Sequence, residues 1–264
     1  MTSPNQNQPD VPGTVAASPA DEWSDTIMDY PVPPQLRDMC AYTGTGSNES
    51  GNEMEEQRFR FRLAHSDECA GSASMLVQKM YATRGYPANP VKRGVMRFTL
   101  MAYQGDKIVG TITLALDSGQ GLLADQLYKP EVEVLRASGR RIGELTKLAI
   151  DHTTGSKYIF AGLLHIAYIY AIRIYDYTDV VMEVVPRHVG YYTKMLGCEE
   201  LGAEKLNPRV NFPVNLLRLS RDYVDGMISR YGGTRLYSET RTLYPYFFSK
   251  ADEDGIMERL MRGD

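Results

Sequence analysis

The hydrophobic positions of this chain alternate with polar ones, or form short apolar runs, in six segments typical of strands. They lie at residues 96–103, 107–117, 142–150, 179–186, 198–206 and 212–220. The first two are joined by a turn centred on Gly105, which predicts a hairpin. Helical patterns cover 157–175 and 187–196, and a strand at 59–63 and a helix at 75–86 come before them. A helix between two strands of one sheet predicts an α/β protein with a central mixed sheet flanked by helices.

The two ends of the chain differ from this central part. Residues 1–57 are rich in Pro, Ser, Asn, Gln, Gly and acidic side chains, and we predict a disordered tail that is not a secretion signal. Residues 58–222 form the predicted α/β domain. Residues 223–264 are dense in Tyr and Phe, and they predict a helical extension packed on that domain, with a last helix starting near Ser249. A partner-docking surface is the alternative for this extension.

One carboxylate stands out within the strand pattern. In the run 142–150, Glu144 shares a face with Ile142, Thr146, Leu148 and Ile150. A carboxylate on an apolar face is costly unless it is paired or functional, and burial raises its pKa towards the range of a general base. A structural salt bridge to a neighbouring arginine is the other interpretation, and the segment alone leaves both open.

Composition excludes several other functions. The net charge of −4 disfavours a nucleic-acid partner, and no spacing of His, Cys or carboxylates predicts a metal site. The three scattered cysteines are typical of a reducing compartment, so we expect a cytoplasmic bacterial protein. The apolar run 159–172 is predicted to be a buried central helix, too short to span a membrane, with His165 as a core histidine.

Several short motifs, in this order, resemble one family. They are VGTITLALD (109–117), ELTKLAID (144–151), VPRH (185–188), YY (191–192), LG (196–197) and PVNLLRL (213–219). Together they are similar to the FeeM-type N-acyl amino acid synthases, which are relatives of the autoinducer synthases in the GNAT superfamily. The resemblance covers roughly residues 58–222. It implies a GNAT-like fold and transfer of a long acyl chain from acyl carrier protein to the α-amine of an amino acid.

The resemblance assigns Glu144 as the base that deprotonates the amine. Tyr192 and His188 are candidates for catalytic contacts. Tyr192 stands five residues before Gly197 rather than the usual four, so packing is its alternative role, and His188 is alternatively a surface residue at a helix start. The predicted substrate contacts are Thr146, Lys147, Tyr81, Arg84 and Tyr191, with ordinary helix packing as the alternative for the residues from 81 to 86.

The donor follows from the segment after the Glu144 strand. The sequence DHTTGSK (151–157) has one glycine and no arginine, unlike the pyrophosphate loop of the superfamily, so it favours a donor that presents only phosphopantetheine. Thr153, Thr154 and Ser156 are predicted to contact that arm or to cap the next helix. We expect no bound cofactor. Arg136, Arg140 and Arg141 are predicted to steer the acidic carrier protein, and a solvated charged edge is the alternative.

Two other functions remain open at this point. One is an acyl-CoA-dependent GNAT N-acyltransferase that acts on another amine. The other is a non-catalytic acyl-binding module that keeps the fold.

Overall fold

A computed structural model describes residues 26–31, 58–151, 156–234, 236–237 and 240–262 of the 264-residue chain. The strands are β1 (Thr26–Pro31), β2 (Arg58–Leu63), β3 (Arg97–Gln104), β4 (Lys107–Leu116), β5 (Ile142–Ile150), β6 (Asp179–Val184), β7 (Glu199–Asn207) and β8 (Phe212–Ser220). The α-helices are α2 (Asp67–Ala82), α3 (Asp125–Ala137), α4 (Ser156–Tyr168), α5 (Pro186–Leu196), α6 (Arg221–Tyr231) and α7 (Lys250–Arg262). A π-helical turn η3 (Ile169–Ile174) extends α4, and a 3₁₀ turn η4 (Tyr244–Tyr246) precedes α7.

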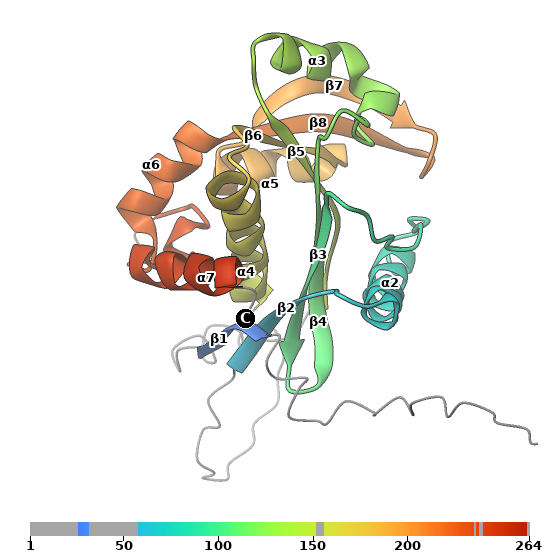
Figure 1. Cartoon of the computed structure of the whole chain (residues 1–264). Coiled ribbons are helices and arrows are strands. Elements are labelled where there is room, and N and C mark those ends of the chain that lie inside the picture. Colours follow the sequence, from blue (N-terminus) through green and yellow to red (C-terminus); the bar gives the residue numbers. More distant parts are fainter. Residues whose placement is uncertain (1–25, 32–57, 152–155, 235, 238–239, 263–264) are drawn as a thin grey trace, which may run out of the picture.

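The strands form one mixed sheet in the order β1-β2-β3-β4-β5-β6-β8-β7. Neighbouring strands are antiparallel except β5 and β6. The parallel ladder of β5 and β6 joins only three residue pairs and ends at Glu144 and Val181. Beyond these pairs β5 continues to Ile150, while β6 runs on beside β8. The sheet therefore opens into a fork next to Glu144, and β7 and β8 curve away above it (Figure 1).

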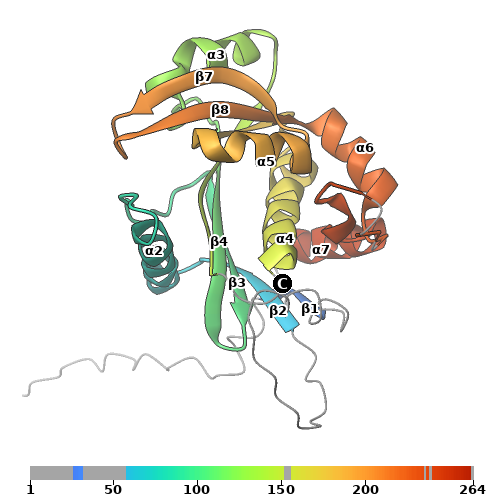
Figure 2. The same ribbon diagram turned by 180° about the vertical axis from the view of Figure 1, so that it is seen from behind.

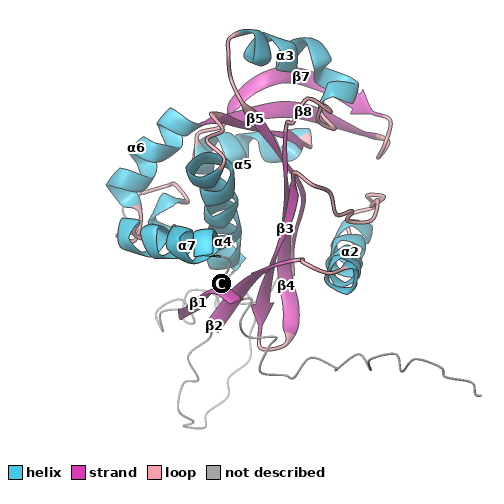
Figure 3. Ribbon diagram, viewed as in Figure 1, coloured by secondary structure: helices cyan, strands magenta, loops and turns pink. Residues whose placement is uncertain are grey.

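Helices cover both faces of this sheet (Figures 2 and 3). One face carries α2 against β4 and β5, and α3 against β7. The other face carries α4, with α6 and α7 outside it. Gly110 of β4 lets α4 approach closely, because an added Cβ would lie 2.5 Å from the Ile159 side chain. The largest cluster of buried side chains lies on this α4 face.

Helix α4 and its π-helical end form the predicted central helix. By length and composition the 18 residues Lys157–Ile174 are apolar enough to cross a membrane, so the prediction that this run is too short was wrong. However, 83% of that stretch is buried inside the fold, as in the core helix of a globular domain.

The C-terminal extension packs on the domain, as predicted. His165 of α4 is fully buried: its Nδ1 accepts the Phe248 N–H at 3.0 Å, and its Nε2 lies 3.2 Å from Glu253 of α7. The prediction of a core histidine is confirmed. Ser249 and Asp252 bond reciprocally at the start of α7, which confirms the predicted helix start.

Two sequence predictions need correction. Thr26–Pro31, inside the predicted disordered tail, forms the edge strand β1 along β2, and the rest of 1–57 lies outside the described residues. Ile27 and Tyr30 have high β propensity, and without β1 the strand β2 would have an unpaired edge, which a single-sequence pattern does not show. Helix α2 begins at Asp67 rather than near residue 75, because the Ser66 hydroxyl caps it by accepting the Cys69 N–H.

Candidate active site

Glu144 lies at the fork of the sheet, on the face covered by α3. It is opposite Ala115 of β4 and Val181 of β6, and its side chain is 1% exposed. Its carboxylate accepts two backbone N–H groups at the start of α3, from Leu123 at 2.7 Å and from Ala124 at 3.0 Å. The carboxylate is thus satisfied by backbone donors, and the structural interpretation by an arginine salt bridge is replaced by this contact.

The environment of Glu144 favours its neutral form. The pKa of Glu144 is raised from 4.5 to about 7, mainly by burial and also by the nearby Glu183 carboxylate, while the two N–H groups and Arg209 act in the opposite direction. Such a group is divided between its acid and base forms at neutral pH. Each of its oxygens keeps a second lone-pair direction, so the carboxylate is able to accept a proton.

A bulge follows Glu144 in β5. Thr146 pairs with Thr113, but Ala149 pairs with Thr111, so two residues of β5 face one residue of β4. Lys147, with φ of 55°, occupies the bulge. The predicted alternation therefore holds for Ile142, Glu144 and Thr146 only. Leu148 and Ile150 pack with the α4-side cluster, which corrects their predicted place on the Glu144 face.

Thr146 and Lys147, two predicted substrate contacts, lie within three residues of Glu144. The Thr146 hydroxyl is buried on the Glu144 side and has no hydrogen-bond partner among the described residues. The Lys147 ammonium instead donates to the Asn89 carbonyl at 2.5 Å, and burial, with help from Arg97, lowers its pKa. Thr146 is therefore the better placed of the two to meet a polar substrate.

The other predicted catalytic and substrate residues form a group of their own. Burial raises the pKa of Tyr81 to about 12, and burial together with the nearby Tyr81 phenol raises that of Tyr192. Burial lowers the pKa of His188, helped by Arg187 and by Arg84. Tyr191, 43% exposed, contacts the ring of Tyr192 with centroids 5.7 Å apart.

These residues come from the end of α2 and from α5. Helix α2 packs on β5, and α5 packs on β7 and β8. The Arg187 guanidinium of α5 donates to the Tyr86 hydroxyl just after α2, which joins the two segments across the fork. The contact of Tyr86 with Phe212 of β8, at 4.5 Å between ring centroids, joins the same two halves.

The predicted contacts to the phosphopantetheine arm fall at the edge of what the structure describes. Thr153 and Thr154 lie outside the described residues. Ser156 is the first residue of α4, which begins soon after the end of β5. These three assignments stay predictions.

The predicted docking arginines are engaged inside the protein. Arg136 is 23% exposed and bonds Asp117 at 2.6 Å and Asp125 at 2.7 Å, so its charge is used to hold α3. Arg140 pairs with the fully buried Asp179 at 3.2 Å. Arg141 is the most exposed of the three, at 53%. Arg136 therefore has a structural role, and its assignment to carrier docking, like those of Arg140 and Arg141, stays a prediction.

Sequence reasoning missed a polar group beside Glu144. Glu183 of β6 lies on the same face two residues beyond Val181, the partner of Glu144. Glu183 accepts from Asn207 at 2.6 Å and pairs with Arg209 of the β7–β8 turn. The signal was available, because Glu183 interrupts the apolar residues 180–184 of β6, as Glu144 interrupts its own strand.

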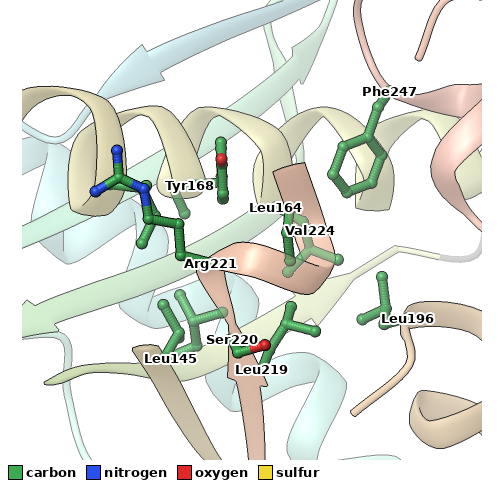
Figure 4. A pocket seen from close by; sticks show the side chains of 12 residues that line it. Leu145, Leu164, Tyr168, Leu196, Leu219, Ser220, Arg221, Val224 and Phe247 are labelled. Carbon is green, nitrogen blue, oxygen red and sulfur yellow. The ribbon is translucent and has the colours of Figure 1, made fainter. Parts of the chain in front are cut away.

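An apolar pocket lies on the opposite face of the fork (Figure 4). Leu145, the neighbour of Glu144, points into it, and Phe247 of the C-terminal extension closes one side. Arg221, paired with Asp176 at 2.7 Å, lies at its rim. The full lining comprises Leu145, Leu164, Ala167, Tyr168, Ile172, Val180, Leu196, Leu219, Ser220, Arg221, Val224 and Phe247.

Within the described residues, no group of three His, Cys, Asp or Glu side chains is arranged to hold a metal ion. The chemistry available at the fork is thus that of one buried carboxylate, a second carboxylate, a hydroxyl and an apolar cavity.

Comparison with known proteins agrees with this arrangement. The family model of the N-acyl amino acid synthase FeeM matches residues 72–220. The solved structure of FeeM, an N-acyl amino acid synthase from uncultured soil microbes, is 25% identical with a TM-score of 0.58, over 62% of this chain and 90% of that one. The AHL synthase LasI is 14% identical with a TM-score of 0.47, over 62% of this chain and 90% of its own.

An acyl-CoA N-acyltransferase from Pseudomonas aeruginosa is 12% identical with a TM-score of 0.43, over 61% and 98% of the two chains. A search of curated proteins finds no match.

The mixed sheet that opens between two parallel strands, with helices on both faces, is a GNAT-like acyltransferase fold. The matched residues make up more than half of the chain, and this chain belongs to the family of the N-acyl amino acid synthase FeeM. The resemblance and the fold class inferred from the sequence are confirmed.

Proposed function

We propose that this protein is an N-acyl amino acid synthase that transfers a long-chain fatty acyl group from acyl carrier protein to the α-amine of an amino acid. The single observation that carries the proposal is Glu144, a carboxylate 1% exposed at the fork with a pKa raised by burial to about 7. Membership of the FeeM family gives the reaction class.

The reaction needs a base because a free amino acid is mostly ammonium at neutral pH. In the proposed mechanism Glu144 removes one ammonium proton, directly or through a water molecule, and the amine nitrogen then attacks the thioester carbonyl. Backbone N–H groups of β6 at the fork are proposed to stabilise the oxyanion. The C–N bond forms, the C–S bond breaks, and the pantetheine sulfur takes a proton from the donor and leaves as a thiol. The nitrogen gives up its second proton as the amide forms, which restores the donor, and the proton on Glu144 is released to solvent.

Tyr192 remains the candidate for the proton donor. Its pKa is raised by burial, so the phenol is protonated at neutral pH. His188 has a lowered pKa, so its imidazole is mostly neutral at neutral pH and is suited to accept a proton rather than to donate one. It is a second candidate for a catalytic contact, at the start of α5.

The apolar pocket behind the fork is the proposed site of the acyl tail. Leu145 and Glu144 are consecutive in β5 and point to opposite faces, so a thioester at the fork has the base on one side and an apolar cavity on the other. Buried apolar side chains favour a hydrocarbon ligand by about 0.8 kcal/mol for each CH₂ removed from water.

The experiment compares lipid extracts from bacteria that express the wild type and Glu144→Gln, analysed by mass spectrometry. We expect new N-acyl amino acids from the wild type and a drop of roughly a hundredfold or more in the variant, the usual contribution of a general base. The masses identify the acyl chain and the amino acid.

The matched control is Glu200→Gln, which changes an exposed carboxylate of the same sheet that accepts from Asn215. Full activity in Glu144→Gln would remove the base assignment. If the wild-type protein is folded but makes no N-acyl amino acid, the synthase proposal is rejected. That outcome favours an acyl-CoA donor with another amine, which is then tested with purified acyl-CoA substrates.

A further inference from the structure

Leu123 links Glu144 to the far side of the sheet. Its backbone N–H donates to Glu144, and its carbonyl accepts from the Arg209 guanidinium at 2.7 Å. The same guanidinium donates to Gln126 at 2.9 Å. Arg209 of the β7–β8 turn therefore holds in place, by hydrogen bonds, the segment whose Leu123 and Ala124 N–H groups donate to the Glu144 carboxylate.

Arg209 is itself held by Glu183. Glu183 pairs with the guanidinium through the oxygen that also accepts from Asn207, and the Asn207 side chain accepts the Arg209 N–H at 2.9 Å. The other oxygen of Glu183 is buried and has no hydrogen-bond partner among the described residues. A buried carboxylate with one oxygen unpaired is costly, which points to a functional rather than a purely structural reason for its position.

The charged groups around Glu144 come from three elements. β6 contributes Glu183, and the β7–β8 turn contributes Arg209. The start of α3 contributes Asp125, whose charge is already matched by Arg136 at 2.7 Å. β4 presents only Ala115 to Glu144. Glu183 and Arg209 are thus the two charged side chains that act on Glu144, and they are paired with each other.

We propose that Arg209 and Glu183 are positioning residues for Glu144: Arg209, oriented by Glu183, holds the Leu123 segment against the Glu144 carboxylate, and the pair sets how readily that carboxylate accepts a proton. The relevance of this pair to catalysis rests on the proposed function, whereas its effect on Glu144 is measurable in the protein without substrate.

The two residues act on Glu144 in opposite directions. Removing the Arg209 cation, together with its grip on Leu123, leaves the ionised Glu144 less stabilised and raises its pKa. Removing the Glu183 anion relieves like-charge repulsion and lowers it. A residue that only stabilised the fold would not produce shifts of opposite sign.

The test measures the Glu144 carboxyl by ¹³C NMR titration in protein labelled at its glutamate side chains, with Glu144→Gln to assign the signal. We expect Arg209→Gln to move the midpoint up by about one unit and Glu183→Gln to move it down by about one unit. The double variant returns towards the wild type. In every variant that keeps activity, the apparent pKa on the acidic side of the plot of kcat/KM against pH is expected to shift by the same amount as the NMR midpoint of Glu144.

Lys205→Gln is the matched control. Lys205 also joins β7 to α3, donating to the Leu127 carbonyl at 3.2 Å and to Glu131 at 2.6 Å, but it is not among the main charges that shift the pKa of Glu144. If Arg209→Gln does not fold, Arg209→Lys replaces it, because lysine keeps the charge but lacks the planar set of N–H donors. A smaller upward shift of the Glu144 midpoint is then expected.

Single variants that leave the Glu144 midpoint unchanged, or move it in the same direction, would overturn the proposal. Opposite shifts in a protein that makes no N-acyl amino acid would support the positioning pair and reject the proposed function instead.

Discussion

Glu144 combines a structural contact with a chemical property. Its carboxylate anchors the residues just before α3 by accepting two backbone N–H groups. Burial nevertheless raises its pKa to about 7. The two backbone donors stabilise the ionised form, and desolvation outweighs them. A buried carboxylate with a pKa near neutral suits the proposed role of Glu144 in proton transfer.

The raised pKa has a consequence for stability. Between pH 4.5 and about 7 the folded state holds a proton on Glu144 that the unfolded chain has released, so the free energy of unfolding falls as pH rises. The loss attributable to this group is about 3 kcal/mol at most by pH 8. We expect chemical denaturation at pH 5 and pH 8 to show this decline in the wild type and a smaller one in Glu144→Gln. Parallel declines in both proteins would contradict the raised pKa.

Residue-level prediction succeeded where one strand contained the whole signal. Glu144 was identified because a carboxylate interrupts an apolar strand, and Glu183 carries the same signal in β6 but was passed over. The ion pair of Arg136 with Asp117 could not be predicted, because Asp117 becomes its neighbour only when α3 packs back over the sheet. A run of charges in sequence does not reveal which of them meet partners in space.

At the scale of elements, the fork and the bulge determine the site. The order of strands and helices was predictable from periodicity, but the end of the β5–β6 ladder at Glu144 and the bulge at Lys147 were not. A positive φ is uncommon for lysine, so no propensity indicated a bulge there. Because of the bulge, β5 turns Leu148 and Ile150 to the α4 face.

The size of the pocket between β5, α4 and α6 is expected to limit the length of the acyl chain. Ala167 of α4 is 2% exposed and lines the pocket, so Ala167→Leu fills part of it. We expect products with acyl chains shorter by about two to four carbons, since each added side-chain carbon displaces about one CH₂ of the ligand. Mass spectrometry of the products measures this directly.

The control for overpacking is Ala161→Leu. Ala161 is also fully buried on α4, but it does not line the pocket. Both variants are expected to lose about 1–3 kcal/mol of stability from overpacking. Only Ala167→Leu should change the acyl length. Equal product profiles in the wild type and Ala167→Leu would mean that the acyl tail lies elsewhere.

At the scale of the whole molecule, both ends of the chain add to the GNAT-like domain. β1 extends the sheet, and the C-terminal extension joins the core through His165 and Glu253 and contributes Phe247 to the pocket. The sequence predicted the packing of this extension from its aromatic density. It could not show which cavity the aromatic side chains would line, because that depends on contacts more than 80 positions apart, such as that of His165 with Phe248.

The identity of the acyl donor is testable by mutation of the predicted docking surface. If an acidic carrier protein docks near the start of β5, the exposed Arg141 is the predicted residue that meets it; its internal partner Asp176 is 4.0 Å away, and such an exposed pair contributes little to stability. Arg141→Glu should then raise KM for acyl donors on carrier protein by roughly tenfold and leave acyl-CoA donors unaffected, because charge complementarity mainly controls association.

Lys107→Glu provides the comparison, since Lys107 is another exposed cation, paired with Asp151 at 3.0 Å, beyond the opposite end of β5. Steady-state kinetics with both donors, at low and at high salt, separate the possibilities. A loss confined to Arg141→Glu and to the carrier-bound donor, and relieved by salt that screens both proteins, supports docking at this edge. An equal effect of the two variants would place the carrier elsewhere, and a preference for acyl-CoA in the wild type would reject the carrier protein as donor.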